Sequence, residues 1–168
     1  LWMIQGEVGS GKSLISQRLI YGLLENGSKL LVITTELTTR GWIEQMESIG
    51  YPITEYIASG RLLVFSRFGV IAESKKGVEI FDVLNSDAVE KADVVVVDSA
   101  SALMPNELDS AEQVSVIQKL RKICSDSRSL LLTVDPVEID EKLLHKLRST
   151  CEVLLDMRAG FVGGEIKR

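Results

Sequence analysis

Eight residues near the start of the chain have the types and spacing needed to hold a phosphate group. They read Gly6-Glu7-Val8-Gly9-Ser10-Gly11-Lys12-Ser13 and match the pattern G-x-x-x-x-G-K-[ST] at every fixed position. The glycines allow backbone conformations that a β-carbon would penalise, so successive N–H groups can turn inward around an anion. The segment therefore predicts a phosphate-binding loop.

The last residues of this loop predict which phosphates it holds. Lys12 would bring a positive charge to the β- and γ-phosphates of ATP, and the Ser13 hydroxyl would bind Mg²⁺. A helix that starts here points its positive end at the same anion. We expect Lys12 to be exposed in the crevice. The predicted nucleotide-binding residues are Gly6, Glu7, Val8, Gly9, Ser10, Gly11, Lys12, Ser13 and Leu14.

The surroundings of the loop favour this interpretation over a glycine-rich segment that only turns the chain. An apolar run at residues 1–5 precedes the loop and is typical of a buried strand. Residues 12–24 place apolar side chains at helical spacing, and Gly27 follows as a helix stop. The sequence thus predicts the order strand, loop, helix that a phosphate-binding loop requires.

A second run predicts where Mg²⁺ is held. Residues 94–97 are four successive valines, as expected of a strand covered on both faces, and Asp98 follows them. Many strands end in Asp, so the pattern alone is weak. Behind a complete phosphate-binding loop, Asp98 is expected to hold Mg²⁺, usually through water, with Ser13 as the other metal ligand.

Glu36 follows the strand predicted at residues 30–34. Open α/β sheets bind ligands at the carboxyl ends of their strands, so Glu36 should face the same crevice as Lys12 and Asp98. There it could orient or deprotonate the water that attacks the γ-phosphate, which makes Glu36 and Lys12 the predicted catalytic residues. Alternatively, Glu36 only caps the next helix or faces solvent. Thr133 and Asp135 end another predicted strand and could sense the γ-phosphate.

Composition excludes several classes of protein. The 168 residues are 45% hydrophobic and 26% charged, which is ordinary for one soluble α/β domain. The net charge of −5 argues against nonspecific binding to nucleic acid or to an anionic membrane, and no apolar stretch is long enough to span a bilayer. Cys124 and Cys151 are expected to be reduced core thiols, and the single histidine, His145, a surface or packing residue.

Apolar β-rich runs alternate with helical patterns, which predicts an α/β fold with a mainly parallel sheet and helices on both faces. We expect one domain over residues 1–168, with its N-terminal start and its last C-terminal strand truncated, and a surface loop over residues 66–77. Gly163-Gly164 should lie in a C-terminal β-hairpin. The predicted strands are residues 2–5, 30–34, 62–65, 94–97, 130–134 and 153–156. The predicted helices are residues 12–24, 41–49, 78–85, 111–125 and 139–147.

A phosphate-binding loop, a glutamate after the next strand and a final hairpin together resemble the RecA/KaiC superfamily. Within it the chain most resembles the ArlH (FlaH) family, the KaiC-like ATP-binding accessory proteins of the archaeal swimming motor, the archaellum. The resemblance covers nearly the whole chain. Beyond the loop it rests on four segments, which read Val32-Ile33-Thr34-Thr35-Glu36, Gln45-Met46-Glu47-Ser48-Ile49-Gly50, Val97-Asp98-Ser99-Ala100-Ser101 and Leu147-Arg148-Ser149-Thr150-Cys151-Glu152.

This resemblance implies an ATP-dependent homo-hexameric ring in the cytoplasm, at the membrane-proximal base of the motor. It implies that the ring binds the motor ATPase ArlI and sits within a ring of the membrane protein ArlX, and that nucleotide occupancy rather than fast turnover is the signal. The family's glycines, Lys12, Ser13, Glu36 and Asp98 carry over position by position. A trans-acting Lys or Arg finger, which KaiC-like proteins carry shortly after the final hairpin, is not assignable before Arg168.

Two other functions use the same core. A RecA/RadA-type DNA repair ATPase needs basic or aromatic loops facing DNA, but residues 99–113 contain Glu107, Asp109 and Glu112 and no Lys or Arg. No nucleic acid partner is therefore expected. A KaiC-type autokinase would need a Ser or Thr near the γ-phosphate bound to a neighbouring subunit, which one sequence does not show.

Overall fold

The computed structural model describes residues 1–67, 87–104, 108–125, 128–158, 160–162 and 165–167. The helix predicted at residues 78–85 and most of the surface loop predicted at residues 66–77 lie outside these described residues.

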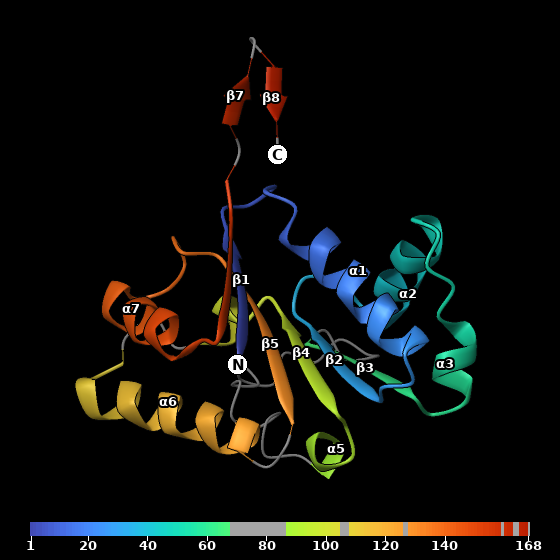
Figure 1. Cartoon of the computed structure of the whole chain (residues 1–168), viewed down its shortest axis with the longest axis horizontal. Helices are drawn as coiled ribbons and strands as arrows, with labels where there is room; N and C mark the ends of the chain where they lie inside the picture. Colours follow the sequence, from blue (N-terminus) through green and yellow to red (C-terminus); the bar gives the residue numbers. More distant parts are fainter. Residues whose placement is uncertain (68–86, 105–107, 126–127, 159, 163–164, 168) are drawn as a thin grey trace.

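Six parallel strands form the central sheet, in the order β3-β2-β4-β5-β1-β6 (Figure 1). All six predicted strands are confirmed. The strands are β1 (Trp2–Gly6), β2 (Leu30–Thr34), β3 (Leu62–Ser66), β4 (Val94–Asp98), β5 (Ser129–Val134) and β6 (Val153–Met157).

The central strands are continuous apolar runs because both faces of the sheet are covered. Val95 and Val97 of β4 point into one hydrophobic cluster, whereas Val94 and Val96 point into the other. In β2, Ile33 points into the first of these clusters and Val32 into the second. Side chains of successive strand residues alternate between faces, so a valine run fills both cores at once.

Helices form a layer on each side of the sheet (Figure 1). Apolar side chains of α1 and α2 lie in the core of one face, and those of α6 and α7 in the core of the other. The helices are α1 (Lys12–Glu25), α2 (Thr39–Ser48), α3 (Thr54–Ala58), α5 (Asp87–Glu90), α6 (Ser110–Ser125) and α7 (Glu141–Thr150), with a 3₁₀ turn, η1 (Ser101–Leu103).

A small antiparallel pair follows the sheet, as the sequence predicts. Strand β7 (Gly160–Val162) pairs with β8 (Glu165–Lys167), and Figure 1 shows the pair projecting from the carboxyl end of β6. The fold is thus a parallel α/β sheet with a C-terminal β-hairpin.

The two cysteines are free, half-buried and packed against the core: Cys124 lies on α6 and Cys151 is the C-cap of α7. Burial raises the pKa of the Cys151 thiol to about 11. His145 is exposed on α7, in agreement with a surface role. None of the helices in the described part of the chain is long and apolar enough to cross a membrane.

Candidate functional site

Four adjacent strands bring the candidate residues to one edge of the sheet. The order β2-β4-β5-β1 places Glu36 after β2, Asp98 at the end of β4, Asp135 after β5 and the loop with Lys12 after β1. In a parallel sheet these ends all lie on the same side. They border a cavity of about 300 Å³. Its lining residues are Val8, Gly9, Gly11, Lys12, Ser13, Leu14, Glu36, Ser99, Asp135 and Glu138.

The glycines of the loop occupy positions that other residues would not tolerate. Gly9 and Gly11 have φ angles of 76° and 96°, in the left-handed region. A β-carbon on Gly6 would lie 2.5 Å from the Ser10 hydroxyl and 2.7 Å from the backbone oxygen of Met157. Gly11 is the N-cap of α1, so the helix begins at the loop with its N-terminus open toward the cavity.

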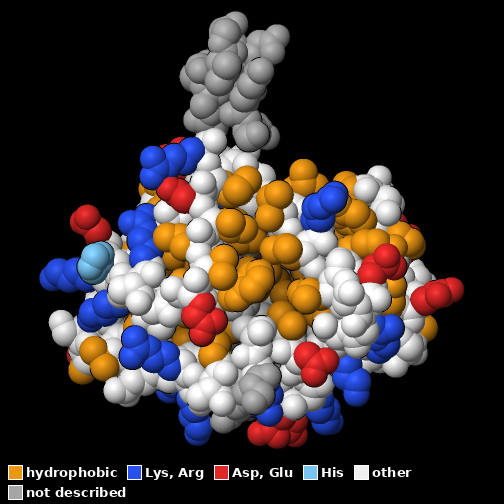
Figure 2. Space-filling model, viewed as in Figure 1, with side chains coloured by type: hydrophobic (Ala, Val, Ile, Leu, Met, Phe, Trp, Pro, Cys, Tyr) orange, Lys and Arg blue, Asp and Glu red, His pale blue; other side chains and the backbone are white. Residues whose placement is uncertain are grey.

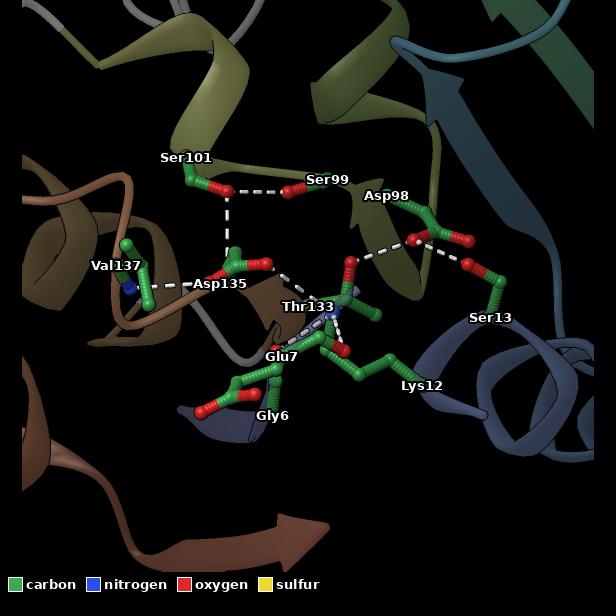
Figure 3. Close-up of polar contacts among 10 residues, drawn as sticks. All are labelled: Gly6, Glu7, Lys12, Ser13, Asp98, Ser99, Ser101, Thr133, Asp135 and Val137. Carbon is green, nitrogen blue, oxygen red and sulfur yellow. Dashed lines mark hydrogen bonds and ion pairs between the residues drawn. The ribbon is translucent and has the colours of Figure 1, made fainter. Parts of the chain in front are cut away.

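Lys12 folds back onto the loop that carries it. Its ammonium donates to the backbone oxygens of Gly6 at 2.6 Å and Glu7 at 2.9 Å, and lies 3.9 Å from a carboxylate oxygen of Asp135 (Figure 3). The residue is only 8% exposed, so the expectation that Lys12 is exposed is wrong. These three oxygens draw the long side chain inward and replace the water around its charge.

Asp98 is buried among hydroxyl groups at the end of β4. One carboxylate oxygen accepts from Thr133 at 2.5 Å and from Ser13 at 3.2 Å (Figure 3), and the other accepts from Ser16 at 3.2 Å. The Asp98–Ser13 hydrogen bond joins the two predicted metal ligands directly. Thr133 therefore contacts the site through Asp98.

Glu36 lies at the rim of the same cavity, on the segment between β2 and α2. Partial burial, followed by the negative charge of Asp98, raises the pKa of the Glu36 carboxyl above its ordinary value, while Lys12 acts in the opposite direction. A carboxyl group with a raised pKa is a stronger base when it is ionised. Of the two alternatives, the role as a helix cap does not hold, because the side chain of Thr38 caps α2. Glu36 is, however, exposed to solvent, as the other alternative predicted.

Three residues in or behind the cavity were not predicted as members of the site. Ser99 and Glu138 line it, and Ser101 supports it from behind: the Ser99 and Ser101 hydroxyls are 2.5 Å apart, and the Asp135 backbone N–H donates to Ser101 at 3.2 Å (Figure 3). Their position within a few residues of the ends of β4 and β5 was the available signal.

A second cavity, of about 520 Å³, lies against the outer side of the loop and shares Val8 and Gly9 with the first. Here Arg148 donates to the Gln5 side chain at 2.7 Å, and Arg158 donates to Asp156 at 2.7 Å. Hydrogen bonds from Gln5 and Arg158 hold the pKa of the Asp156 carboxyl below its ordinary value. The loop therefore separates a region rich in carboxylates from one that contains two arginines.

The chemistry of these residues fits a nucleoside triphosphate with Mg²⁺. Gly6 closes against the chain so tightly that no side chain fits there, and Lys12 supplies a buried ammonium. Ser13 and Asp98 present adjacent oxygen ligands, which Mg²⁺ prefers, while phosphates and water usually complete its shell. Among the described residues, no cluster of three His, Cys, Asp or Glu side chains could hold a metal by itself.

Comparison with known proteins agrees with this geometry. The profile of the family described as "ATPase: KaiC" matches residues 1–147. The protein named archaeal flagellar ATP-binding protein FlaH from Methanocaldococcus jannaschii is 32% identical over 168 residues, which cover 99% of this chain and 72% of the relative. The FlaH of Methanococcus voltae is 28% identical over 165 residues, covering 98% of this chain and 72% of the relative.

A solved structure has the same fold. The crystal structure of the flagellar accessory protein FlaH from Methanocaldococcus jannaschii superposes with a TM-score of 0.86 at 31% sequence identity. The match covers 98% of this chain and 73% of that one. The similarity therefore extends over the sheet, the loop and the strand ends that border the cavity.

Proposed function

The chain belongs to the KaiC family of ATPases, in its FlaH branch, and we propose on that premise that it is the ATP-binding regulatory subunit of the archaeal swimming motor. The single observation that carries this proposal is that Lys12 and Ser13 line one cavity at the N-terminus of α1, with Asp98 hydrogen-bonded to Ser13 directly behind them. The relatives are named as flagellar ATP-binding proteins, which favours this role over DNA repair or autophosphorylation.

Each residue of the site has one part in nucleotide binding. The backbone of residues 6–11 surrounds the phosphates, and Lys12 leaves the backbone oxygens of Gly6 and Glu7 to contact the β- and γ-phosphates. Ser13 and Asp98 hold Mg²⁺, which when bound offsets the negative charge of the phosphates. The hydroxyls of Thr133 and Ser16 keep Asp98 in place.

Glu36 is the proposed group for activating water. Partial burial and the charge of Asp98 raise the pKa of its carboxyl, and Glu36 lines the cavity at a position exposed to solvent. A carboxylate there can orient an attacking water molecule and accept its proton. Turnover is proposed to be slow, so that nucleotide occupancy is the regulatory signal.

The assembly is proposed to be a nucleotide-dependent homo-hexamer. It would lie in the cytoplasm at the membrane-proximal base of the archaellum, within the ring of ArlX, and engage the motor ATPase ArlI. The name of the relatives supports an association with the archaeal flagellum. The negative net charge of −5 favours proteins over nucleic acid as the partners of this chain.

Replacement of the loop lysine tests the proposal. Lys12→Ala removes the ammonium that contacts the phosphates, so ATP–Mg²⁺ binding measured by calorimetry should be lost. ATP–Mg²⁺ at 100 times its Kd should stabilise the wild type by about 2.7 kcal/mol and the variant by almost nothing. Lys142→Ala, an exposed lysine on α7, is the control and should bind as the wild type does. Equal stabilisation of the wild type and Lys12→Ala would contradict the proposal.

A further inference from the structure

We propose that Asp135 determines which nucleotide this site prefers: its carboxylate competes with the terminal phosphate for Lys12, and so weakens binding of a nucleoside triphosphate relative to the diphosphate. The inference rests on the proposed function, since it concerns the same site. It differs from the sensing role considered for Asp135 in the sequence analysis, because here Asp135 opposes binding of the γ-phosphate.

Lys12 is shared between the loop and this aspartate. Its ammonium has three oxygen neighbours, the backbone oxygens of Gly6 and Glu7 and a carboxylate oxygen of Asp135 at 3.9 Å (Figure 3). The side chains of Lys12 and Asp135 are 9% and 6% exposed. Charges that are shielded from water interact more strongly than charges on the surface, so solvent and salt screen the attraction between Lys12 and Asp135 only weakly.

Asp135 is held in place by hydrogen bonds of its own. One of its carboxylate oxygens accepts from the Val137 backbone N–H at 3.0 Å, while its own N–H donates to the Ser101 hydroxyl at 3.2 Å. Its other carboxylate oxygen is the one near Lys12 (Figure 3). These two hydrogen bonds fix the position of the aspartate beside the lysine.

Acidic groups outnumber basic ones around the cavity. Glu36, Asp135 and Glu138 line it, and among the described lining residues Lys12 is the one cation. The lysine of such a loop contacts the β- and γ-phosphates, so a carboxylate next to Lys12 is also next to the γ-phosphate. A triphosphate carries more negative charge into this region than a diphosphate, and repulsion from Asp135 acts mainly on the triphosphate.

The test compares two nucleotides in one variant. Asp135→Asn keeps the shape of the side chain and removes its charge. The Kd of ATP–Mg²⁺, measured by calorimetry at fixed ionic strength, should fall by about tenfold or more, and the Kd of ADP–Mg²⁺ by much less. Asp135→Glu, which keeps the charge, should leave the ratio of the two Kd values near that of the wild type. Asp87→Asn, an exposed aspartate on α5, is the control for net charge.

The ratio of the two Kd values separates this role from a purely structural one. If Asp135 were only structural, its substitution would weaken binding of both nucleotides by a similar factor. Should Asp135→Asn fold poorly, Asp135→Ser serves as the second uncharged variant, and its ratio is measured in the same way. An unchanged ratio, or a ratio shifted toward ADP, would overturn the proposal. A wild type that binds neither nucleotide would instead contradict the proposed function, so the two failures are distinguishable.

Discussion

At the scale of single residues, two carboxylates of one site are held in different ways. Asp98 is 6% exposed and accepts hydrogen bonds from three hydroxyl groups. Glu36 lies at the rim, where the structure shows no such donors in the described part of the chain, and its pKa is raised. Donors stabilise an ionised carboxylate, whereas partial burial and a negative neighbour favour its protonated form. The first arrangement suits a metal ligand and the second suits a base.

Glu36→Gln should therefore change stability in a pH-dependent way. The raised pKa means that the folded protein holds the Glu36 proton more tightly than the unfolded chain does, so ionisation of Glu36 opposes folding. That cost is absent below the ordinary pKa of 4.5 and fully present above the raised pKa. Without nucleotide, the variant should melt above the wild type at pH 7 to 8, with no difference near pH 4.

Two further measurements complete this test. Glu55→Gln removes the same charge from a position on α3, away from the cavity, and is the control for net charge. In the same Glu36→Gln variant, ATP should still bind, while any hydrolysis falls by on the order of 10²-fold. A melting difference of the same size at pH 4 would show that the gain in stability does not come from removing the ionisation of Glu36.

The site residues that could be predicted from the sequence are those for which the chemistry requires a particular residue type at a fixed spacing. Lys12, Ser13 and Asp98 follow from the loop pattern and from a valine strand that ends in an acid. Ser16 could not be found in this way, and for Ser101 the only signal was its place just after β4, because each acts by a hydrogen bond to a residue far along the chain. Such contacts depend on the packing of strands and helices, which no local pattern encodes.

At the scale of elements, one buried amide joins α6 to α7. Gln113 of α6 is 3% exposed and donates to a carboxylate oxygen of Asp140 at 3.0 Å. Its own oxygen accepts from Lys146 of α7 at 2.9 Å. Asp140 also caps α7 by accepting from the backbone N–H groups of Lys142 and Leu143 at 3.0 Å. One aspartate thus begins a helix and holds it against its neighbour.

Asp140→Ala is expected to cost more than loss of an ordinary helix cap. Removal of a cap costs about 1 kcal/mol, and the buried Gln113 amide would also lose a partner, which costs about 1–3 kcal/mol. Asp109→Ala is the matched control, because the exposed Asp109 caps α6 by accepting from the backbone N–H groups of Ala111 and Glu112. Urea unfolding should give the larger loss for Asp140→Ala. Equal losses would show that the contact with Gln113 adds nothing.

Element ends show where sequence patterns stop being informative. The strands were predicted to within a residue or two, since burial on both faces makes them unbroken apolar runs. Helix α2 starts at Thr39 rather than at residue 41, because Thr38 caps it, and α7 starts at Glu141 rather than at residue 139, because Asp140 caps it. The short helices α3 and α5 were not predicted, as neither completes enough turns for a hydrophobic period.

At the scale of the whole molecule, apolar surface gathers on one face. Figure 2 shows hydrophobic side chains over the middle of the view. Large hydrophobic residues of β1 and β6 are exposed: Trp2 by 43%, Leu154 by 41% and Leu155 by 39%. Strand β6 is also an edge of the six-stranded sheet. Exposed apolar groups on an edge strand favour contact with further protein, which supports association of this chain.

Ring assembly should depend on the nucleotide. A bound γ-phosphate at a subunit boundary can pair with a cation on the next subunit, so an interface built partly on that contact should strengthen with ATP–Mg²⁺. Repetition of one such head-to-tail contact closes a ring when the rotation between neighbouring subunits divides a full turn evenly. We therefore expect the mass in solution, measured by light scattering after size exclusion, to shift from monomer toward hexamer when ATP–Mg²⁺ is added. Lys12→Ala should block the shift, because it loses the phosphate contact, whereas Lys142→Ala should retain it. If the wild-type protein binds ATP but stays monomeric at saturating ATP–Mg²⁺, this interface alone does not drive assembly, and ring formation would require the partner proteins.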